Sequence, residues 1–253
     1  MDIEKYLDRI DAVKINEPTL DYLAHIQKQH VLCVPFENVD IIRKKRLSLN
    51  VDALYQKLVI ERHGGVCYEL NGSFFHLLEE LGFRPYLMAG TVYAGNGKWA
   101  FENTHMFIIV PVDGEEYLVD VGFGGNCPRL PVPFSGEEVI DTDGIYRVKK
   151  EEAVSLYYLQ KKSSDEWETL YRFEPPTPDK WTFETIQPIC VWTETSPDSK
   201  FNKIYFLSRV TEDGRITLSG DTLTIVNGSE KVKEKVEDCE ISEVARRYFG
   251  LEI

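Results

Sequence analysis

Apolar side chains recur every three or four residues through the first third of the chain, which is the spacing of an amphipathic helix. Stripes of this kind run through residues 3–10, 20–24 and 51–59. Another runs from Cys67 to Leu81, after Gly64-Gly65 and before Gly82, a residue type common just past a helix end. The pattern predicts a helical bundle over residues 1–83, with Cys67 in the first turn of its last helix.

After Phe83 the pattern changes to short β-type runs separated by Gly, Asp, Asn and Pro. The runs are residues 84–93, 105–112, 116–122, 145–149, 154–161 and 167–173. They predict an antiparallel β-barrel or curled sheet over residues 84–178, with a linker at Pro175, Pro176 and Pro178. Strands at 201–210, 215–218 and 222–226 and a helix at 241–249 predict an α/β lid over residues 179–253. The expected fold class is α+β.

Composition narrows the possible partners. With 253 residues, 43% hydrophobic and 28% charged, the chain can form an ordinary globular core. A formal charge of −13 repels phosphate backbones and anionic lipids, so we expect neither nucleic acid nor membrane as a partner. No apolar run approaches the ~18 residues of a membrane span, and the start of the chain does not read as a signal peptide. A cytoplasmic location is expected.

The five cysteines are odd in number and widely spaced, which fits neither a disulfide framework nor a zinc site. The chain also has no phosphate-binding loop and no HExxH motif. We therefore expect no metal, and any chemistry must come from scattered side chains that the fold brings together.

A predicted β-hairpin brings two such side chains, His105 and Asp120, close together. Asp113-Gly114 between two apolar runs predicts a two-residue turn, which pairs Val112 with Glu115. In that register Asp120 is the diagonal neighbour of His105, within reach of a carboxylate-imidazole hydrogen bond. A three-residue turn would put the two side chains on opposite faces of the sheet.

Cys67 is the candidate nucleophile. A helix N-terminus and a neighbouring imidazolium both stabilise a thiolate, and an imidazole oriented by a carboxylate can manage its proton. Each residue also has a purely structural explanation: Cys67 as a packed residue at a helix start, and His105 and Asp120 as residues that end strands. The spacing alone leaves both explanations open.

Five sequence words resemble the arylamine N-acetyltransferase family in order and approximate spacing. They are Val34-Pro35-Phe36-Glu37-Asn38, Gly64-Gly65-Val66-Cys67-Tyr68-Glu69-Leu70-Asn71, Thr104-His105, Leu118-Val119-Asp120-Val121-Gly122-Phe123-Gly124 and Ser196-Pro197-Asp198-Ser199-Lys200-Phe201. The resemblance implies a cysteine-protease/transglutaminase-like core with Cys67, His105 and Asp120 as the catalytic triad. It also implies a ping-pong reaction, in which acetyl-CoA acetylates Cys67 and an arylamine, arylhydrazine or arylhydroxylamine then takes the acetyl group.

The resemblance also suggests binding residues. Phe36, Phe123 and Phe201 match positions that line the acceptor pocket, and Thr104 matches the position beside the catalytic histidine. Gly124 and Gly125 are expected to let the backbone approach the cofactor. Lys200 and Lys203, with the basic run at residues 43–46, are candidates for the negative charges of CoA.

One position departs from the family. Its members usually carry Arg immediately before Gly-Gly, where it is expected to pair with the Glu of the Pro-Phe-Glu-Asn word. This chain has His63 there and Arg62 one place earlier. A bidentate pair with Glu37 is therefore in doubt, and either Arg62 substitutes through a local shift or His63 makes a weaker, pH-dependent contact.

Two other functions remain as alternatives. A transglutaminase-like or papain-like enzyme would use the same three residues on peptide amides and would ignore acetyl-CoA. A non-catalytic module would bind aryl ligands without acylation of Cys67.

Overall fold

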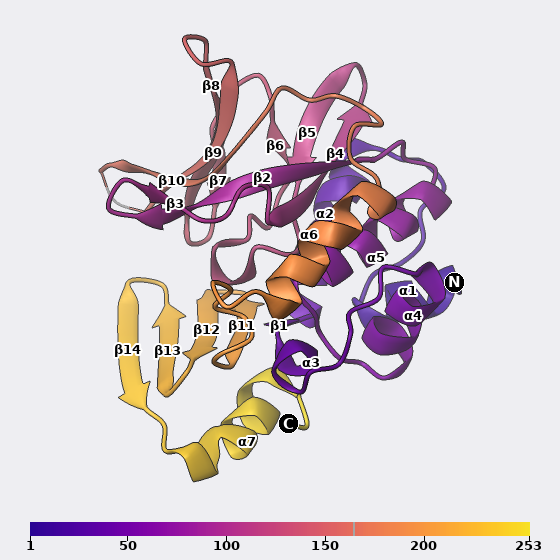
Figure 1. Cartoon of the computed structure of the whole chain (residues 1–253). Helices are drawn as coiled ribbons and strands as arrows, with labels where there is room; N and C mark the ends of the chain where they lie inside the picture. Colours follow the sequence, from indigo (N-terminus) through magenta and orange to yellow (C-terminus); the bar gives the residue numbers. More distant parts are fainter. Residues whose placement is uncertain (164) are drawn as a thin grey trace.

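The computed structural model describes residues 1–163 and 165–253. Helices gather at the N-terminal part of the chain, a curled sheet forms the middle, and a second sheet with a closing helix forms the C-terminal part (Figure 1). This arrangement confirms the α+β class with an antiparallel barrel. Every helix in the described chain is too short or too polar to cross a bilayer.

The N-terminal helices follow the apolar stripes. The elements are α1 (Ile3–Arg9), α2 (Leu20–Cys33), β1 (Phe36–Glu37), α3 (Val39–Ile42), α4 (Val51–Tyr55), the π-helical turn η1 (Gln56–Ile60) and α5 (Cys67–Glu80). Asp2, Thr19 and Asn50 cap α1, α2 and α4 through side-chain oxygens that accept backbone N–H groups. The helix predicted after Gly64-Gly65 is confirmed, and Cys67 is its first residue.

The barrel is an antiparallel sheet with the order β6-β5-β4-β2-β10-β9-β8-β7, and β3 pairs with β2. Its elements are β2 (Tyr86–Gly95), β3 (Lys98–Trp99), β4 (His105–Val112), β5 (Glu115–Val119), η2 (Gly124–Asn126), β6 (Val132–Pro133), β7 (Val139–Asp141), β8 (Gly144–Glu151), β9 (Leu156–Lys162) and β10 (Trp167–Phe173). The two-residue hairpin is confirmed: Val112 pairs with Glu115, and both Asp113 and Gly114 have the positive φ of a type I′ turn.

The C-terminal part contains a second antiparallel sheet with the order β1-β11-β12-β13-β14. Its elements are α6 (Phe183–Thr195), β11 (Phe206–Thr211), β12 (Gly214–Ser219), β13 (Thr222–Asn227), β14 (Glu230–Lys235), η3 (Asp238–Glu240), α7 (Ile241–Val244) and η4 (Ala245–Phe249). The N-terminal strand β1 pairs with β11, so the sheet joins the two ends of the sequence.

Two predicted strand boundaries were wrong. The run at 116–122 leaves the ladder after Val119, because the side chain of Asp120 accepts the N–H of Gly122. The run at 201–210 becomes a strand only at Phe206, because the side chain of Asn38 holds the preceding turn: it donates to Phe201 O and accepts from the Phe206 N–H.

Buried charge joins the barrel to the C-terminal sheet. Arg129 is 2% exposed and pairs with Asp141 and Asp143, each at 3.1 Å. Its other terminal nitrogen donates to Thr211 O and Gly214 O at the β11–β12 turn. The guanidinium therefore fixes the lid hairpin against the barrel.

Candidate active site

The head of α5 is built on close backbone approach. Glu37 N donates to Gly65 O at 2.9 Å, which brings β1 against the Gly-Gly segment. A Cβ at Gly64 would lie 2.0 Å from Pro35 O, and a Cβ at Gly65 would lie 2.7 Å from a carboxylate oxygen of Glu69. Only glycine fits at these two positions, so Gly64-Gly65 allows β1 to pass directly beside the first turn of the helix.

His105 and Asp120 lie together as the hairpin register predicted. His105 is the first residue of β4, and its Nε2 lies 2.7 Å from Asp120 Oδ2. Both side chains are buried, at 3% and 0% exposure. Since Nε2 is committed to the carboxylate, Nδ1 is the ring nitrogen that remains available to exchange a proton with Cys67, whose Sγ lies 3.8 Å from the carbonyl oxygen of Thr104, the residue before His105.

Asp120 is held by groups from three elements. Asn71 on α5 donates to Oδ1 at 3.0 Å, the Gly122 N–H donates to the same oxygen at 2.9 Å, and the Tyr171 hydroxyl of β10 donates to Oδ2 at 3.0 Å. Asn71 lies one helical turn after Cys67 and also accepts the Val121 N–H. The carboxylate is therefore fixed relative to the helix that carries the thiol.

The charges in this group support one another. Burial by itself would lower the pKa of His105, but Asp120 and Cys67 outweigh it and raise that pKa to about 10. Burial would raise the pKa of Asp120, but His105, Asn71 and the Gly122 N–H lower it. An imidazolium beside a carboxylate is thus the favoured state, which is the environment that stabilises a thiolate.

The resting thiol has a partner on the barrel side. Cys67 Sγ lies 3.8 Å from Thr104 O, and the Tyr68 hydroxyl donates to the same carbonyl at 2.7 Å. Tyr68 also lies 2.9 Å from the hydroxyl of Thr193 on α6. Thr104 thus lies beside Cys67 and His105, and its own side chain donates to Phe101 O.

The three phenylalanines expected to line the acceptor pocket lie in two separate places. Phe123 packs on the edge of the His105 ring, with centroids 4.9 Å apart. Phe36 and Phe201 pack on each other at 5.8 Å, and both contact Phe206. Phe123 therefore borders the imidazole, and Phe36 and Phe201 belong to a three-ring cluster between β1 and the lid.

The two glycines after Phe123 lie in a closely packed turn. A Cβ at Gly125 would lie 2.8 Å from the side chain of Arg215 and 3.0 Å from that of Ser208. Gly124 has φ +72 and faces Phe206 and Phe36. Both glycines therefore let this turn pack closely on other parts of the chain, and their expected role beside the cofactor stays a prediction.

Arg62 and His63 are the two residues expected to pair with Glu37, and in the described chain neither of them forms an ion pair with it. Arg62 has φ +57 and is exposed at the surface. The cation beside Glu37 is Lys57 of η1, whose Nζ lies 3.7 Å from Glu37 and 2.7 Å from Glu69. The sequence carries a signal for this residue, because Lys57 lies three positions after Leu54 on the apolar stripe of its helix.

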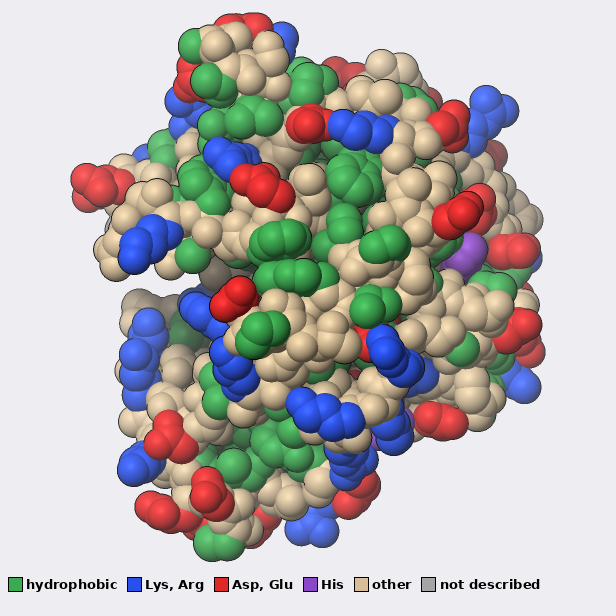
Figure 2. All heavy atoms as spheres, in the orientation of Figure 1, with side chains coloured by type: hydrophobic (Ala, Val, Ile, Leu, Met, Phe, Trp, Pro, Cys, Tyr) green, Lys and Arg blue, Asp and Glu red, His purple; other side chains and the backbone are tan. Residues whose placement is uncertain are grey.

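Basic segments far apart in the sequence meet on the surface. Lys44 Nζ donates to Asn202 O at 3.4 Å, which brings the run at 43–46 beside Lys200 and Lys203. Figure 2 shows several Lys and Arg side chains close together in the lower middle of the face drawn, with Asp and Glu side chains around them. Lys45 pairs with Asp40 and Arg46 with Glu194, whereas Lys200 is exposed.

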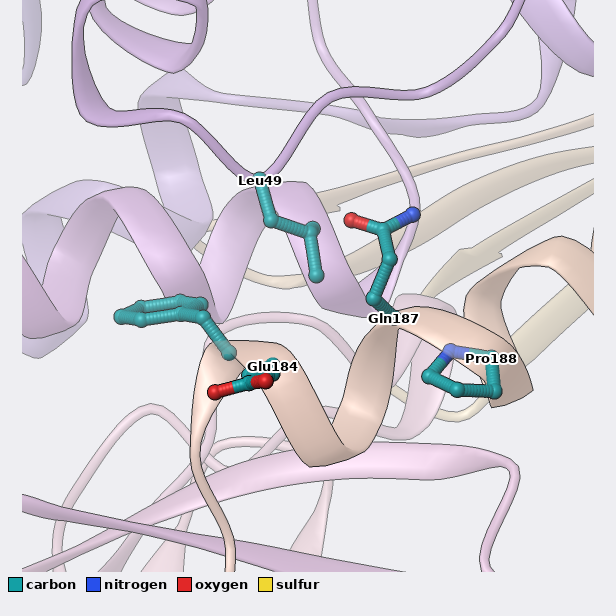
Figure 3. Close-up of a pocket in the computed structure, with 5 residues that line it drawn as sticks. Leu49, Glu184, Gln187 and Pro188 are labelled. Atoms are coloured by element: carbon teal, nitrogen blue, oxygen red, sulfur yellow. The ribbon is translucent and has the colours of Figure 1, made fainter.

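A surface hollow of about 400 Å³ lies apart from this site (Figure 3). It is lined by Leu49, Phe183, Glu184, Gln187 and Pro188, so it lies between the loop before α4 and the first turns of α6. None of the residues around the thiol lines it. Among the described residues, no group of His, Cys, Asp and Glu side chains is arranged to hold a metal ion.

Comparisons with known proteins agree with the geometry. A family model described as N-acetyltransferase matches residues 19–253. An arylamine N-acetyltransferase of Mycobacterium tuberculosis is 33% identical over 100% of this chain and 90% of its own length. An uncharacterized acetyltransferase of Bacillus subtilis is 35% identical over 85% of each chain.

Solved structures give the same result. The arylamine N-acetyltransferase of Bacillus cereus, described with a unique Cys-His-Glu triad, matches with a TM-score of 0.90 at 30% identity over 100% of both chains. The Mycobacterium marinum enzyme in complex with CoA matches with a TM-score of 0.89 at 32% identity, covering 98% of this chain and 92% of its own. The chain therefore belongs to the arylamine N-acetyltransferase family.

Proposed function

We propose that this protein transfers the acetyl group of acetyl-CoA to an arylamine, arylhydrazine or arylhydroxylamine nitrogen or oxygen, through an acetyl thioester on Cys67. The observation that carries the proposal is the buried hydrogen bond between Asp120 and His105 beside a thiol at the head of α5, where Cys67 Sγ lies 3.8 Å from Thr104 O. The named activity of the relatives and the CoA complex of one of them support the same reaction.

In the first half-reaction the Cys67 thiolate attacks the carbonyl carbon of acetyl-CoA. The sulfur–carbon bond to CoA breaks, and the departing thiolate takes the proton that His105 holds on Nδ1. In the second half-reaction the acceptor attacks the thioester, His105 takes the acceptor's proton, and the Cys67 thiolate is released. Asp120 keeps the imidazole oriented throughout.

The oxyanion of each tetrahedral intermediate lies near the head of α5. Intrahelical bonding there starts with the N–H groups of Glu69 and Leu70, which donate to Val66 O. The N–H groups of Cys67 and Tyr68 precede them and point out of the helix end. We assign these two donors to the developing negative charge.

The acceptor and the cofactor must both reach Cys67, because each half-reaction takes place at its sulfur. We assign Phe123 and Thr104, which border His105 and Cys67, and the Phe36–Phe201 pair to the acceptor pocket, because aromatic rings favour flat aryl groups. We assign Lys200, beside Lys44, to the phosphates of CoA. Gly124 and Gly125 contribute indirectly, by shaping the turn beneath the lid.

The alternatives are less well supported. Neither a peptide-directed enzyme nor a non-catalytic module accounts for a family match that spans residues 19–253.

A cytoplasmic location fits the free thiols, since the five cysteines are unpaired in the described chain.

Intact-protein mass after brief exposure to acetyl-CoA without acceptor tests the proposal. We expect one acetyl group on the wild type and none on Cys67→Ala, because the thioester needs the thiol. Addition of an arylamine should then remove the acetyl group. An unmodified wild type would contradict the proposal and favour a peptide-directed or non-catalytic function.

A further inference from the structure

A lysine lies nearly buried among three carboxylates at the head of α5. The side chain of Lys57 is 14% exposed, and its Nζ lies 2.7 Å from Glu69, 2.9 Å from Asp40 and 3.7 Å from Glu37. These carboxylates come from α5, α3 and β1. One ammonium group on η1 thus joins three other elements.

The two most buried carboxylates are close because of the backbone path. The pairing of β1 with Gly65 sets Glu37 beside Glu69, and both residues are almost fully buried. Burial and the neighbouring Glu37 raise the pKa of Glu69 to about 7, although Lys57 opposes this. Without a cation between them, the two buried carboxylates would have to separate or take up a proton, and Glu69 would lose the partner that holds it in place.

Glu69 also fixes the residue before the nucleophile. Its other carboxylate oxygen accepts the Val66 N–H at 3.1 Å, so the side chain reaches back over the start of the helix. Cys67 follows Val66 directly. The two carboxylate oxygens of Glu69 therefore bind Lys57 and the Val66 N–H, and these two contacts determine where the first turn of α5 begins.

We propose that Lys57 is a positioning residue for Cys67: it holds Glu69 and Glu37 together and thereby keeps the thiol in line with His105. The proposal rests on the proposed role of Cys67 as the nucleophile. Lys57 touches no reacting atom and acts through Glu69.

The test follows the reactivity of Cys67 in Lys57→Met and Lys57→Arg. Acetylation by acetyl-CoA is measured by quenched intact mass, and alkylation by iodoacetamide is measured at Cys67 by peptide mass from pH 5 to 9. In Lys57→Met we expect both rates to fall about tenfold at pH 7, with the alkylation profile shifted to higher pH, because a displaced thiol lies further from the positive charge of protonated His105. Lys57→Arg keeps a cation and should recover most of the rate.

Lys161→Met is the matched control. Lys161 is also a buried lysine paired with a carboxylate, Asp143 at 2.7 Å, but on β9. Its loss should lower the melting temperature and leave the alkylation profile of Cys67 at the wild-type position. A folded Lys57→Met variant with wild-type rates and profile would overturn the proposal.

Glu69→Gln keeps the test decisive if Lys57→Met does not fold. The side-chain amide of this variant retains an acceptor for the Val66 N–H and removes one buried charge, so adding Lys57→Met to Glu69→Gln should change the rates by less than about threefold. A tenfold loss in that background would overturn the proposal, because Lys57 would then act without Glu69. If wild-type Cys67 takes up no acetyl group, the proposed function fails, and alkylation, which needs no acetyl-CoA, still decides the role of Lys57.

Discussion

Asp120 shows how much one side chain contributes at this site. Its two oxygens accept from an imidazole, an amide, a phenol and a backbone N–H, so the carboxylate can be fully buried without an unmet hydrogen bond. The donors come from the helix that bears Cys67, from strands β4 and β10 of the barrel, and from the segment that follows β5. The same residue therefore sets the tautomer of His105 and the distance between helix and sheet.

Asp120→Asn should remove the charge and largely preserve the shape. The pKa of His105 is about 10 in the folded protein and near 6.5 in an unfolded chain. Protonation of His105 therefore stabilises the fold fully below about pH 6.5, and this contribution is lost as the pH rises toward about 10. The stability difference between wild type and variant, measured by urea denaturation, should thus be largest at pH 6 and shrink by pH 10. Acetylation of Cys67 at pH 7 should fall by roughly 10³-fold or more.

An equal stability difference at pH 6 and pH 10 would show that the charge of Asp120 does not stabilise His105. Tyr171→Phe is a useful comparison, because it removes one neutral donor to Asp120 and leaves the charge in place.

At the scale of elements, the site depends on where α5 meets the end of β5. The segment after Asp120 passes so close to α5 that a Cβ at Gly122 would lie 2.8 Å from Cys67 Cα and 2.7 Å from Asn71 Nδ2. Cys67 Cα is a backbone atom, so it cannot move aside unless the start of the helix moves with it. The glycine is therefore a condition for the thiol, the imidazole and the carboxylate to meet.

Gly122→Ala should separate the helix from the strand end. Overpacking of this kind lowers the free energy of unfolding by about 1–3 kcal/mol, and acetylation of Cys67 should slow more than stability alone explains. Gly97→Ala is a control for a glycine-to-alanine change without a steric contact, since an added Cβ there meets nothing within 4 Å and only its φ of +72 disfavours alanine. Wild-type acetylation in Gly122→Ala would contradict the close approach.

Sequence periodicity identified most of these elements but not all of them. Helix α6 contains Pro188 and was not predicted, and β14 was not predicted because all six of its residues are exposed and most are charged. Strand β1 spans two residues, too few to show a period. Such elements form because neighbours pack or pair with them, which a local pattern does not record.

For the whole molecule, the net charge of −13 conflicts with an anionic cofactor unless positive charge gathers locally. The run at 43–46 and the lysines at 200 and 203 are about 150 residues apart in sequence, yet Lys44 contacts Asn202. Lys45 and Arg46 are paired with Asp40 and Glu194, which leaves Arg43, Lys44, Lys200 and Lys203 as the candidates for phosphate contact among the described residues of these segments.

Lys44→Glu combined with Lys200→Glu should raise the apparent KM for acetyl-CoA about tenfold, equivalent to about 1.4 kcal/mol. Acetylation of Cys67 by p-nitrophenyl acetate, which has no phosphate, should be unaffected. Lys149→Glu combined with Lys150→Glu, two exposed lysines on β8, makes the same change in net charge and is the control. An unchanged KM for acetyl-CoA would remove the patch from the cofactor site.

The sequence by itself determined the helix of Cys67, the hairpin register and the pairing of His105 with Asp120, because each follows from local periodicity or from a two-residue turn. The reaction class came from the five short motifs that resemble the arylamine N-acetyltransferase family. The tertiary structure decided what holds these residues: Asn71 and Tyr171 on Asp120, Lys57 in place of the expected Arg62 or His63, and the filled space beside Gly125. These contacts join segments distant in sequence, and burial, which turns an ordinary lysine or tyrosine into a fixed partner, exists only after the chain has folded.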